Sequence, residues 1–306
     1  MGISSGKGPK VAVLMGGHSL EREVSLISGR ACSAALRGKD FEVLELDAGH
    51  DVVQRLSELR PDVVFNALHG RWGEDGSIQG VLEWLRIPYT HSGVMASALA
   101  MDKHRSKHIF SDFGLPTAQG FIIEKTNLIN AHPLQRPYVV KPINEGSSIG
   151  VYFVNPAEDP PLDLSSDMPS ILMVEEYIPG RELTVTVMGK KALLVTDIIT
   201  QEWYDYDAKY KNGGSVHEVP AKIPEKIKEK CLEYALSAHE LIGCRGISRA
   251  DFRWDESLGL DGLILLEINT QPGMTPTSLV PEQAEICGVK FGDLCQWLVE
   301  DASCDR

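Results

Sequence analysis

Two segments near the end of the chain constrain its fold most, because both alternate side chains as strands do. They are SRADFRW (248–254) and the start of LLEINTQPGMTPTSLVPE (265–282). Between them lies DESLGLDG (255–262), whose aspartates and glycines predict a hairpin connection. The two segments therefore predict a pair of antiparallel strands.

The polar side chains of this hairpin predict a metal site. Arg249 and Asp251 share one face of their strand, and Glu267 and Asn269 share one face of theirs. Centring the hairpin on Gly259 places Asp251 opposite Glu267 and Arg249 opposite Asn269. Two facing carboxylates repel each other, whereas oxygen ligands suit a magnesium ion bound through phosphates. The alternative is a solvated polar face, but the apolar run that ends at Glu267 indicates a buried site.

Length and charge limit the possible functions. A chain of 306 residues has room for two or three domains. Its 30 basic and 43 acidic residues give a net charge of −13, which argues against a nucleic-acid-binding surface. No apolar run is long enough to span a membrane, and the first ten residues lack a signal-peptide core. We therefore expect a cytoplasmic protein with no nucleic-acid or membrane partner, and the six scattered cysteines predict free thiols.

The first hundred residues show the pattern of a doubly wound α/β unit. KVAVLMGG (10–17), FEVLELD (41–47) and PDVVFNALHG (61–70) are short apolar runs separated by helical spacing. The loop with Glu21 follows the first strand, and the loop with His69 and Glu74 follows the third. In open α/β sheets ligands bind at this carboxyl edge, so we expect the two loops to face one cleft.

The middle of the chain carries candidate phosphate contacts. NEGSSIG (144–150) lies between two predicted strands and resembles a phosphate-cradling loop without being a Walker A sequence; an ordinary hairpin turn is the alternative. Lys141 ends the strand before it, where a lysine reaches either water or an anion. Lys103 starts a predicted helix, which is unfavourable for the helix dipole, although a plain surface lysine remains possible.

Two further segments belong to the same region. VEEYIPGREL (174–183) places acids where they could accept from an adenine amino group or from ribose hydroxyls, with a solvated strand end as the alternative. WYDYDAKYKNGG (203–214) is aromatic, charged and ends in two glycines, which is typical of a mobile lid.

The complete set of features resembles the ATP-grasp superfamily. Within it, the longer motifs resemble the D-alanine–D-alanine ligases over essentially the whole chain; they are MGGHSLEREVSLISG, ALHGRWGEDG, YTHSGVMASALAMDKHRSK, KPINEGSSIGV, YDYDAKY and LEINTQPGMTPTSLVP. The departures are His18, at a variable position, and SRADF before the metal face. The resemblance implies an α/β (α+β overall) fold, with an N-terminal doubly wound parallel-sheet domain (1–95) and two ATP-grasp parts with antiparallel sheets (96–180 and 181–306, with a lid at 203–217).

The resemblance also implies a reaction. The carboxylate of one D-alanine attacks the γ-phosphate of ATP, and the amine of a second D-alanine attacks the resulting acyl phosphate. The dipeptide serves peptidoglycan precursor synthesis. The implied cofactors are ATP and two Mg²⁺ ions, with Mn²⁺ as a substitute, held by Asp251, Glu267 and Asn269. The implied partners are D-alanine and ATP, and a homodimer is the family expectation.

The same motifs imply the residues that handle the amino acids. Glu21 should hold the ammonium group of the first substrate, with His69 lining that region. Ser278 and the backbone of Leu279 should bind the carboxylate of the second substrate.

Catalytic residues follow in the same way. Arg249 and the Gly273 backbone N–H should stabilise the tetrahedral oxyanion. Ser147 and Tyr210 should hydrogen-bond with Glu21 and fasten the lid.

The implied nucleotide contacts form a larger set. They are Lys103, Lys141, Ser148, Glu175, Ile178, Glu182, Trp203 and Lys209. The lysines should contact phosphates, and the two glutamates should bind adenine and ribose.

Two other readings remain. A nicotinamide-dependent dehydrogenase would use the first αβ unit with Asp47 on the ribose, but MGGHSLE lacks the G-x-G-x-x-G spacing. A catalytically dead nucleotide-binding regulator would not need the complete set of oxygen ligands together with Arg249.

Overall fold

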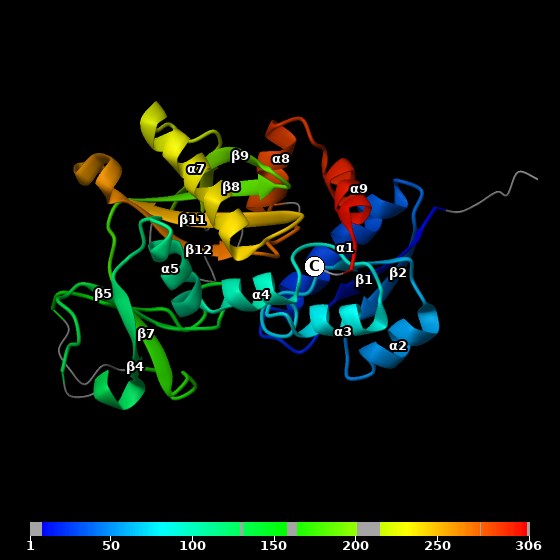
Figure 1. Ribbon diagram of the computed structural model, residues 1–306, viewed down its shortest axis with the longest axis horizontal. Helices are drawn as coiled ribbons and strands as arrows, with labels where there is room; N and C mark the ends of the chain where they lie inside the picture. Colours follow the sequence, from blue (N-terminus) through cyan, green and yellow to red (C-terminus); the bar gives the residue numbers. More distant parts are fainter. Residues whose placement is uncertain (1–7, 129–130, 158–163, 201–214, 276, 305–306) are drawn as a thin grey trace, which may run out of the picture.

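The computed structural model describes residues 8–128, 131–157, 164–200, 215–275 and 277–304, which contain three sheets (Figure 1). The first sheet is parallel, in the order β2-β1-β3. Its strands are β1 (Lys10–Met15), β2 (Glu42–Asp47) and β3 (Val63–Asn66). The helices of this part are α1 (Arg22–Arg37), α2 (Val52–Leu59) and α3 (Ser77–Leu85).

The central strand of this sheet is covered on both faces, which explains its continuous apolar sequence. Val11 to Leu14 are fully buried. One face packs against α1 and against α9 (Phe291–Asp301), which returns from the end of the chain to lie beside α1 (Figure 1). Helix α9 belongs to the predicted third part of the chain, yet it shares a core with the predicted first domain. The domain bounds at residues 95 and 180 stay a prediction.

Two antiparallel sheets follow, as the sequence predicts. The second has the order β4-β7-β5-β6 and the third the order β10-β9-β8-β11-β12. Their strands are β4 (Gly120–Glu124), β5 (Tyr138–Pro142), β6 (Tyr152–Val154), β7 (Ile171–Glu176), β8 (Arg181–Met188), β9 (Lys191–Ile199), β10 (Val216–Glu218), β11 (Ile247–Trp254) and β12 (Leu263–Asn269). The predicted lid spans residues 203–217, and its last two residues belong to β10.

Helices cover the third sheet and connect it to the rest. They are α4 (Val94–Met101), α5 (Lys103–Asp112), α7 (Glu225–Ile242) and α8 (Leu279–Ile286). Alanines of α7 and α4 and Phe110 of α5 pack with the apolar face of β8 and β11 in one core. Two 3₁₀ turns complete the elements, η1 (Lys125–Leu128) and η2 (Glu256–Gly262). No helix in the described ranges is long and apolar enough to cross a membrane.

The predicted register of the C-terminal hairpin is confirmed where it matters for the site. Asp251 pairs with Glu267 and Arg249 pairs with Asn269. A bulge follows Asp251, so beyond it the strands are shifted by one residue. The predicted turn is the 3₁₀ segment η2, in which Gly259 has φ +59°.

Ser19 lies just before α1 but does not cap it. Helix α1 has Glu21 at its N-cap position without a side-chain cap bond. The Ser19 hydroxyl instead donates to the backbone carbonyl of His69 at 2.6 Å and accepts from the Glu21 N–H. The serine thus ties together the two loops that follow β1 and β3.

Candidate active site

Two adjoining cavities contain every predicted site residue that the structure describes. Lys103, Gly146 and Glu267 line both cavities. The first cavity is also lined by Glu21, His69, Ser147, Arg249, Asn269, Gly273, Ser278 and Leu279. The second is also lined by Lys141, Ser148, Glu175, Ile178, Glu182 and Asp251. Trp203, Lys209 and Tyr210 lie outside the described residues.

The small-residue loop separates the two cavities. Ser147 faces the first cavity and Ser148 the second, although the two residues are adjacent in sequence. Both have positive φ values, 50° and 58°, a conformation that costs non-glycine residues on the order of 1 kcal/mol or more each and clusters at functional sites. The turn therefore aims neighbouring hydroxyls into different cavities.

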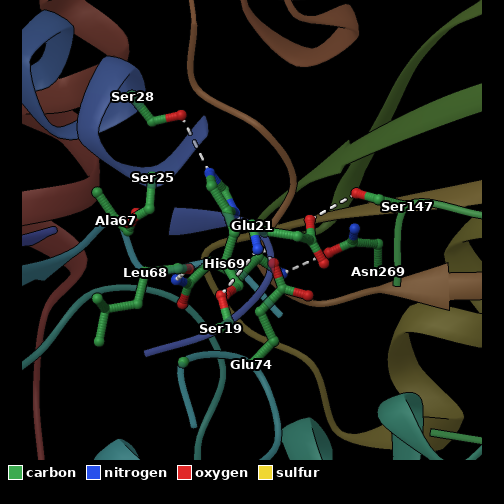
Figure 2. A network of polar contacts seen from close by, with 12 residues as sticks. Ser19, Glu21, Ser25, Ser28, Ala67, Leu68, His69, Glu74, Ser147 and Asn269 are labelled. Atoms are coloured by element: carbon green, nitrogen blue, oxygen red, sulfur yellow. Dashed lines mark hydrogen bonds and ion pairs between the residues drawn. The ribbon is translucent and has the colours of Figure 1, made fainter. Parts of the chain in front are cut away.

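Glu21 projects from the start of α1 into the first cavity. Its carboxylate is buried and accepts a hydrogen bond from the Ser147 hydroxyl (Figure 2). Gly70 and Gly146 make room for it, because a Cβ at either position would lie within 2.9 Å of Glu21 Oε1. This contact joins the first loop to the small-residue loop, as the family pattern implies.

His69 is fixed from both sides of its ring. Nδ1 lies 3.0 Å from Glu74 Oε1, and Nε2 lies 3.0 Å from the Ser28 hydroxyl (Figure 2). Burial alone would lower the pKa of His69, but the hydrogen bond and charge of Glu74, with a contribution from Glu21, raise it. The imidazole is therefore oriented and biased toward its charged form beside the first cavity.

Each of the two facing carboxylates of the hairpin pairs with a cation. Arg249 donates to Asp251 from Nε at 2.8 Å and from Nη2 at 2.7 Å. The Thr184 hydroxyl donates to Asp251 Oδ1 at 2.7 Å. Lys103 Nζ lies 3.2 Å from Glu267 Oε2. The sequence analysis missed Thr184, although alternation along β8 places it on the face of the sheet that bears Asp251.

The oxygen donors of this face fit a divalent cation. Asp251 and Glu267 lie directly opposite each other, and Asn269 follows on the same face of β12. The Asn269 Oδ1 accepts from the Gln271 N–H at 2.9 Å, and an amide oxygen keeps a second lone pair. Two carboxylates and an amide oxygen form a hard donor set of the kind that magnesium prefers.

Glu175 lies deep in the second cavity between two lysines. It is 3% exposed, and one carboxylate oxygen accepts from Lys107 while the other accepts from Lys141. Burial by itself would raise its pKa, but the charges and hydrogen bonds of Lys141 and Lys107 lower the pKa of Glu175 to about 2. Lys107 was missed in the sequence; the available signal is its spacing of four from Lys103 on one helix.

This low pKa predicts how acid affects stability. The folded-state pKa of about 2 lies below the ordinary 4.5, so the stabilisation is present above pH 4.5 and is lost as pH falls toward 2. In Glu175→Gln the residue cannot titrate. The difference in unfolding free energy between wild type and variant should therefore shrink by about 3 kcal/mol over this range. Denaturant titrations at several pH values measure it, and a constant difference would contradict the lysine-held carboxylate.

The end of the first cavity is formed by the start of α8. Ser278 occupies the N-cap position without a capping bond, and its hydroxyl accepts from the Thr275 N–H at 3.0 Å. A Cβ at Gly273 would lie 2.9 Å from that hydroxyl, so a glycine is needed for the close approach. The first N–H groups of α8 lack intrahelical partners and carry a partial positive charge, which suits a carboxylate.

Comparisons with known proteins show which family the chain resembles. Residues 47–92 match the family model for the D-ala D-ala ligase N-terminus, and residues 109–300 match that for its C-terminus. A D-alanine–D-alanine ligase of Ruegeria pomeroyi is 66% identical over 306 residues, covering 100% of both chains. One from Cereibacter sphaeroides is 65% identical and covers 97% of both.

Solved structures show the same fold. The D-alanine–D-alanine ligase from Bacillus anthracis, complexed with ATP, matches with a TM-score of 0.78 and 27% identity. The match covers 96% of this chain and 97% of the other. The family models, the full-length relatives and the shared architecture together show that this chain belongs to the D-alanine–D-alanine ligase family.

Proposed function

We propose that the protein joins two D-alanines at the expense of ATP and releases D-alanyl-D-alanine, ADP and phosphate, as a cytoplasmic enzyme of peptidoglycan precursor synthesis. The observation that carries the proposal is the junction of the two cavities at Lys103 and Glu267. One cavity offers groups for ammonium and carboxylate, and the other offers lysines and glutamates for a nucleotide. A reaction between an amino acid and a terminal phosphate requires such a junction.

The first substrate binds between the loops after β1 and β3. Glu21 pairs with its ammonium group, and His69 lines the site in a fixed orientation. With the ammonium anchored there, the substrate carboxylate points toward Lys103, where it attacks the γ-phosphate. The oxygen–phosphorus bond that forms gives the acyl phosphate, and ADP leaves.

The second substrate binds at the start of α8. Ser278 and the Leu279 backbone receive its carboxylate, so its free amine points back toward the acyl carbonyl. Attack forms the C–N bond through a tetrahedral oxyanion, which Arg249 and the Gly273 N–H stabilise before phosphate departs.

The nucleotide occupies the second cavity. Glu182 and Ile178 lie at its adenosine end, and Glu175 retains lone pairs beyond its two lysine contacts. Asp251, Glu267 and Asn269 would hold two magnesium ions, or manganese in their place, which would supply positive charge to neutralise the transferring phosphoryl group. Exclusion of water from the acyl phosphate falls to the predicted lid.

The dehydrogenase reading is disfavoured by the surroundings of Asp47. Its carboxylate pairs with Arg22 through both oxygens and accepts from the Gly17 N–H. The residue therefore already holds the turn after β1, and a ribose would have to compete with Arg22 and the Gly17 N–H for its oxygens.

Substrate stereochemistry tests the proposal. Phosphate release with ATP and magnesium should require D-alanine, and L-alanine should be at least about a hundredfold less effective. The reason is that each substrate is held by one charged group, the first by Glu21 and the second by the start of α8, while its other end must reach the reaction centre, so inversion at Cα redirects the methyl group. The measurement is phosphate release with a panel of D- and L-amino acids. Equal turnover with both enantiomers would defeat the assignment.

A homodimer, expected from the family, is tested by light scattering of the purified protein.

A further inference from the structure

A buried glutamine joins the two halves of the active site. Gln271 is 2% exposed and Asn66, at the end of β3, is 1% exposed. Gln271 Oε1 accepts from Asn66 Nδ2 at 2.6 Å, and Gln271 Nε2 donates to the Leu68 carbonyl. These bonds span more than two hundred positions of sequence and end at the residue that precedes His69.

The backbone of the same residue contacts the catalytic face. Its N–H donates to Asn269 Oδ1 at 2.9 Å. Gln271 lies two residues before Gly273. One residue therefore touches the first-substrate loop through its side chain and the proposed metal and oxyanion segment through its backbone.

The loop that receives this side chain is itself fixed. Asn66 Nδ2 also donates to the Gly73 carbonyl at 3.0 Å, and Asn66 Oδ1 accepts from the Leu68 N–H at 3.2 Å. Gln79 Nε2 donates to the same Gly73 carbonyl at 2.8 Å. These bonds already order the loop. The additional bonds from the Gln271 carboxamide therefore fix the distance between the loop and the end of β12.

We propose that Gln271 is a positioning residue that sets the separation between the first-substrate loop at Leu68–His69 and the segment from Asn269 to Gly273. The proposal rests on the proposed function, since the two segments hold the reacting groups of that reaction. An apolar side chain of similar length at position 271 would fill the same space. It would not make the hydrogen bonds to Asn66 and Leu68 that fix the separation of the two segments. Displacement of reacting groups by about 1 Å costs on the order of a hundredfold in rate.

Gln271→Met is the first test, with Gln79→Met as its matched control. Both replace a buried glutamine by a thioether of similar length, but the Gln79 side chain, in α3, donates to Gly73 of the preceding loop and not across to the segment after β12. We expect Gln271→Met to lower kcat about ten- to a hundredfold and to raise the KM for D-alanine, with the KM for ATP within about twofold. Gln79→Met should lose thermal stability while keeping kcat and both KM values within about twofold.

Gln271→Glu is the second test, for the case in which Gln271→Met does not fold. It keeps the length and the acceptor for Asn66 but loses the donor to Leu68. It should lower kcat and raise the KM for D-alanine in the same direction as Gln271→Met, with the KM for ATP within about twofold. Unchanged kinetics in either variant of Gln271, or equal losses in the two methionine variants, would each overturn the positioning role. Failure of the wild type to form D-alanyl-D-alanine would instead overturn the proposed function.

Discussion

Glu267→Gln should leave the protein folded and lower its turnover by more than about a hundredfold. The substitution removes one negative charge and one ligand oxygen with little change of shape. Glu267 is the only predicted metal ligand among the described residues that lines both cavities, at the junction where the proposed mechanism brings substrate and nucleotide together. In metalloenzymes, loss of a residue that only hydrogen-bonds to a metal ligand already lowers metal affinity or activity about ten- to a hundredfold. Loss of a direct ligand should therefore lower activity more.

Asp197→Asn is the matched control for this variant. It makes the same carboxylate-to-amide change on the same sheet, at a buried residue whose cationic partner is Arg181 and which lines neither cavity. It should lose stability but keep turnover. Binding of Mn²⁺, followed by its paramagnetic resonance in the presence of ADP, should weaken in Glu267→Gln alone. Activity like that of the wild type at saturating magnesium would show that Glu267 is not a ligand.

The catalytic face of the hairpin could be predicted because alternation determines which residues share a face. The predicted centre at Gly259 gives the observed pairs Asp251–Glu267 and Arg249–Asn269. Nearer the turn the same centre is wrong by one residue, since the bulge after Asp251 shifts the pairing to Trp254–Leu263. A bulge depends on local packing, which a pattern of polar and apolar residues does not contain.

Contacts between distant segments could not be predicted from one sequence. Glu175 was expected to contact adenine or ribose, yet its two oxygens also hold Lys107 and Lys141, from a helix and a strand on different sides. The pair Asn66–Gln271 likewise joins residues that no local pattern relates. Such partners are set by how sheets and helices pack against one another, which explains why Lys107, Thr184 and Gln271 were missed.

The chemistry of the site was more accessible than its substrate. Facing carboxylates, a lysine at a strand end and a small-residue loop indicate metal and phosphate without reference to any relative. D-alanine entered only through the resemblance, because the groups proposed to bind the amino acids come from loops separated by more than two hundred residues. Once folded, Glu21 and Ser278 line one cavity, and their separation in sequence no longer matters.

Arg249→Ala should lower turnover on the order of a hundred- to a thousandfold while changing the dissociation constant for ATP much less. A donor aimed at a developing oxyanion acts in the transition state and not in nucleotide binding, and removing one costs about this much. Arg249 lines the first cavity, to which the proposed mechanism assigns the carbonyl of the acyl phosphate, and it does not line the second, which the mechanism assigns to the nucleotide. The loss should therefore appear in kcat.

The pairing of Arg249 with Asp251 requires a control that separates catalysis from stability. Arg181→Ala provides it, because Arg181 also donates two hydrogen bonds to a buried aspartate, Asp197, and lines neither cavity. Removing either arginine leaves a buried carboxylate without its cation, so both variants should lose stability. Only Arg249→Ala should lose turnover, measured as single-turnover dipeptide formation below the melting temperature of each variant. A variant that binds ATP weakly but turns over normally would place Arg249 in nucleotide binding, and equal losses of turnover in both variants would reduce its role to holding the sheet.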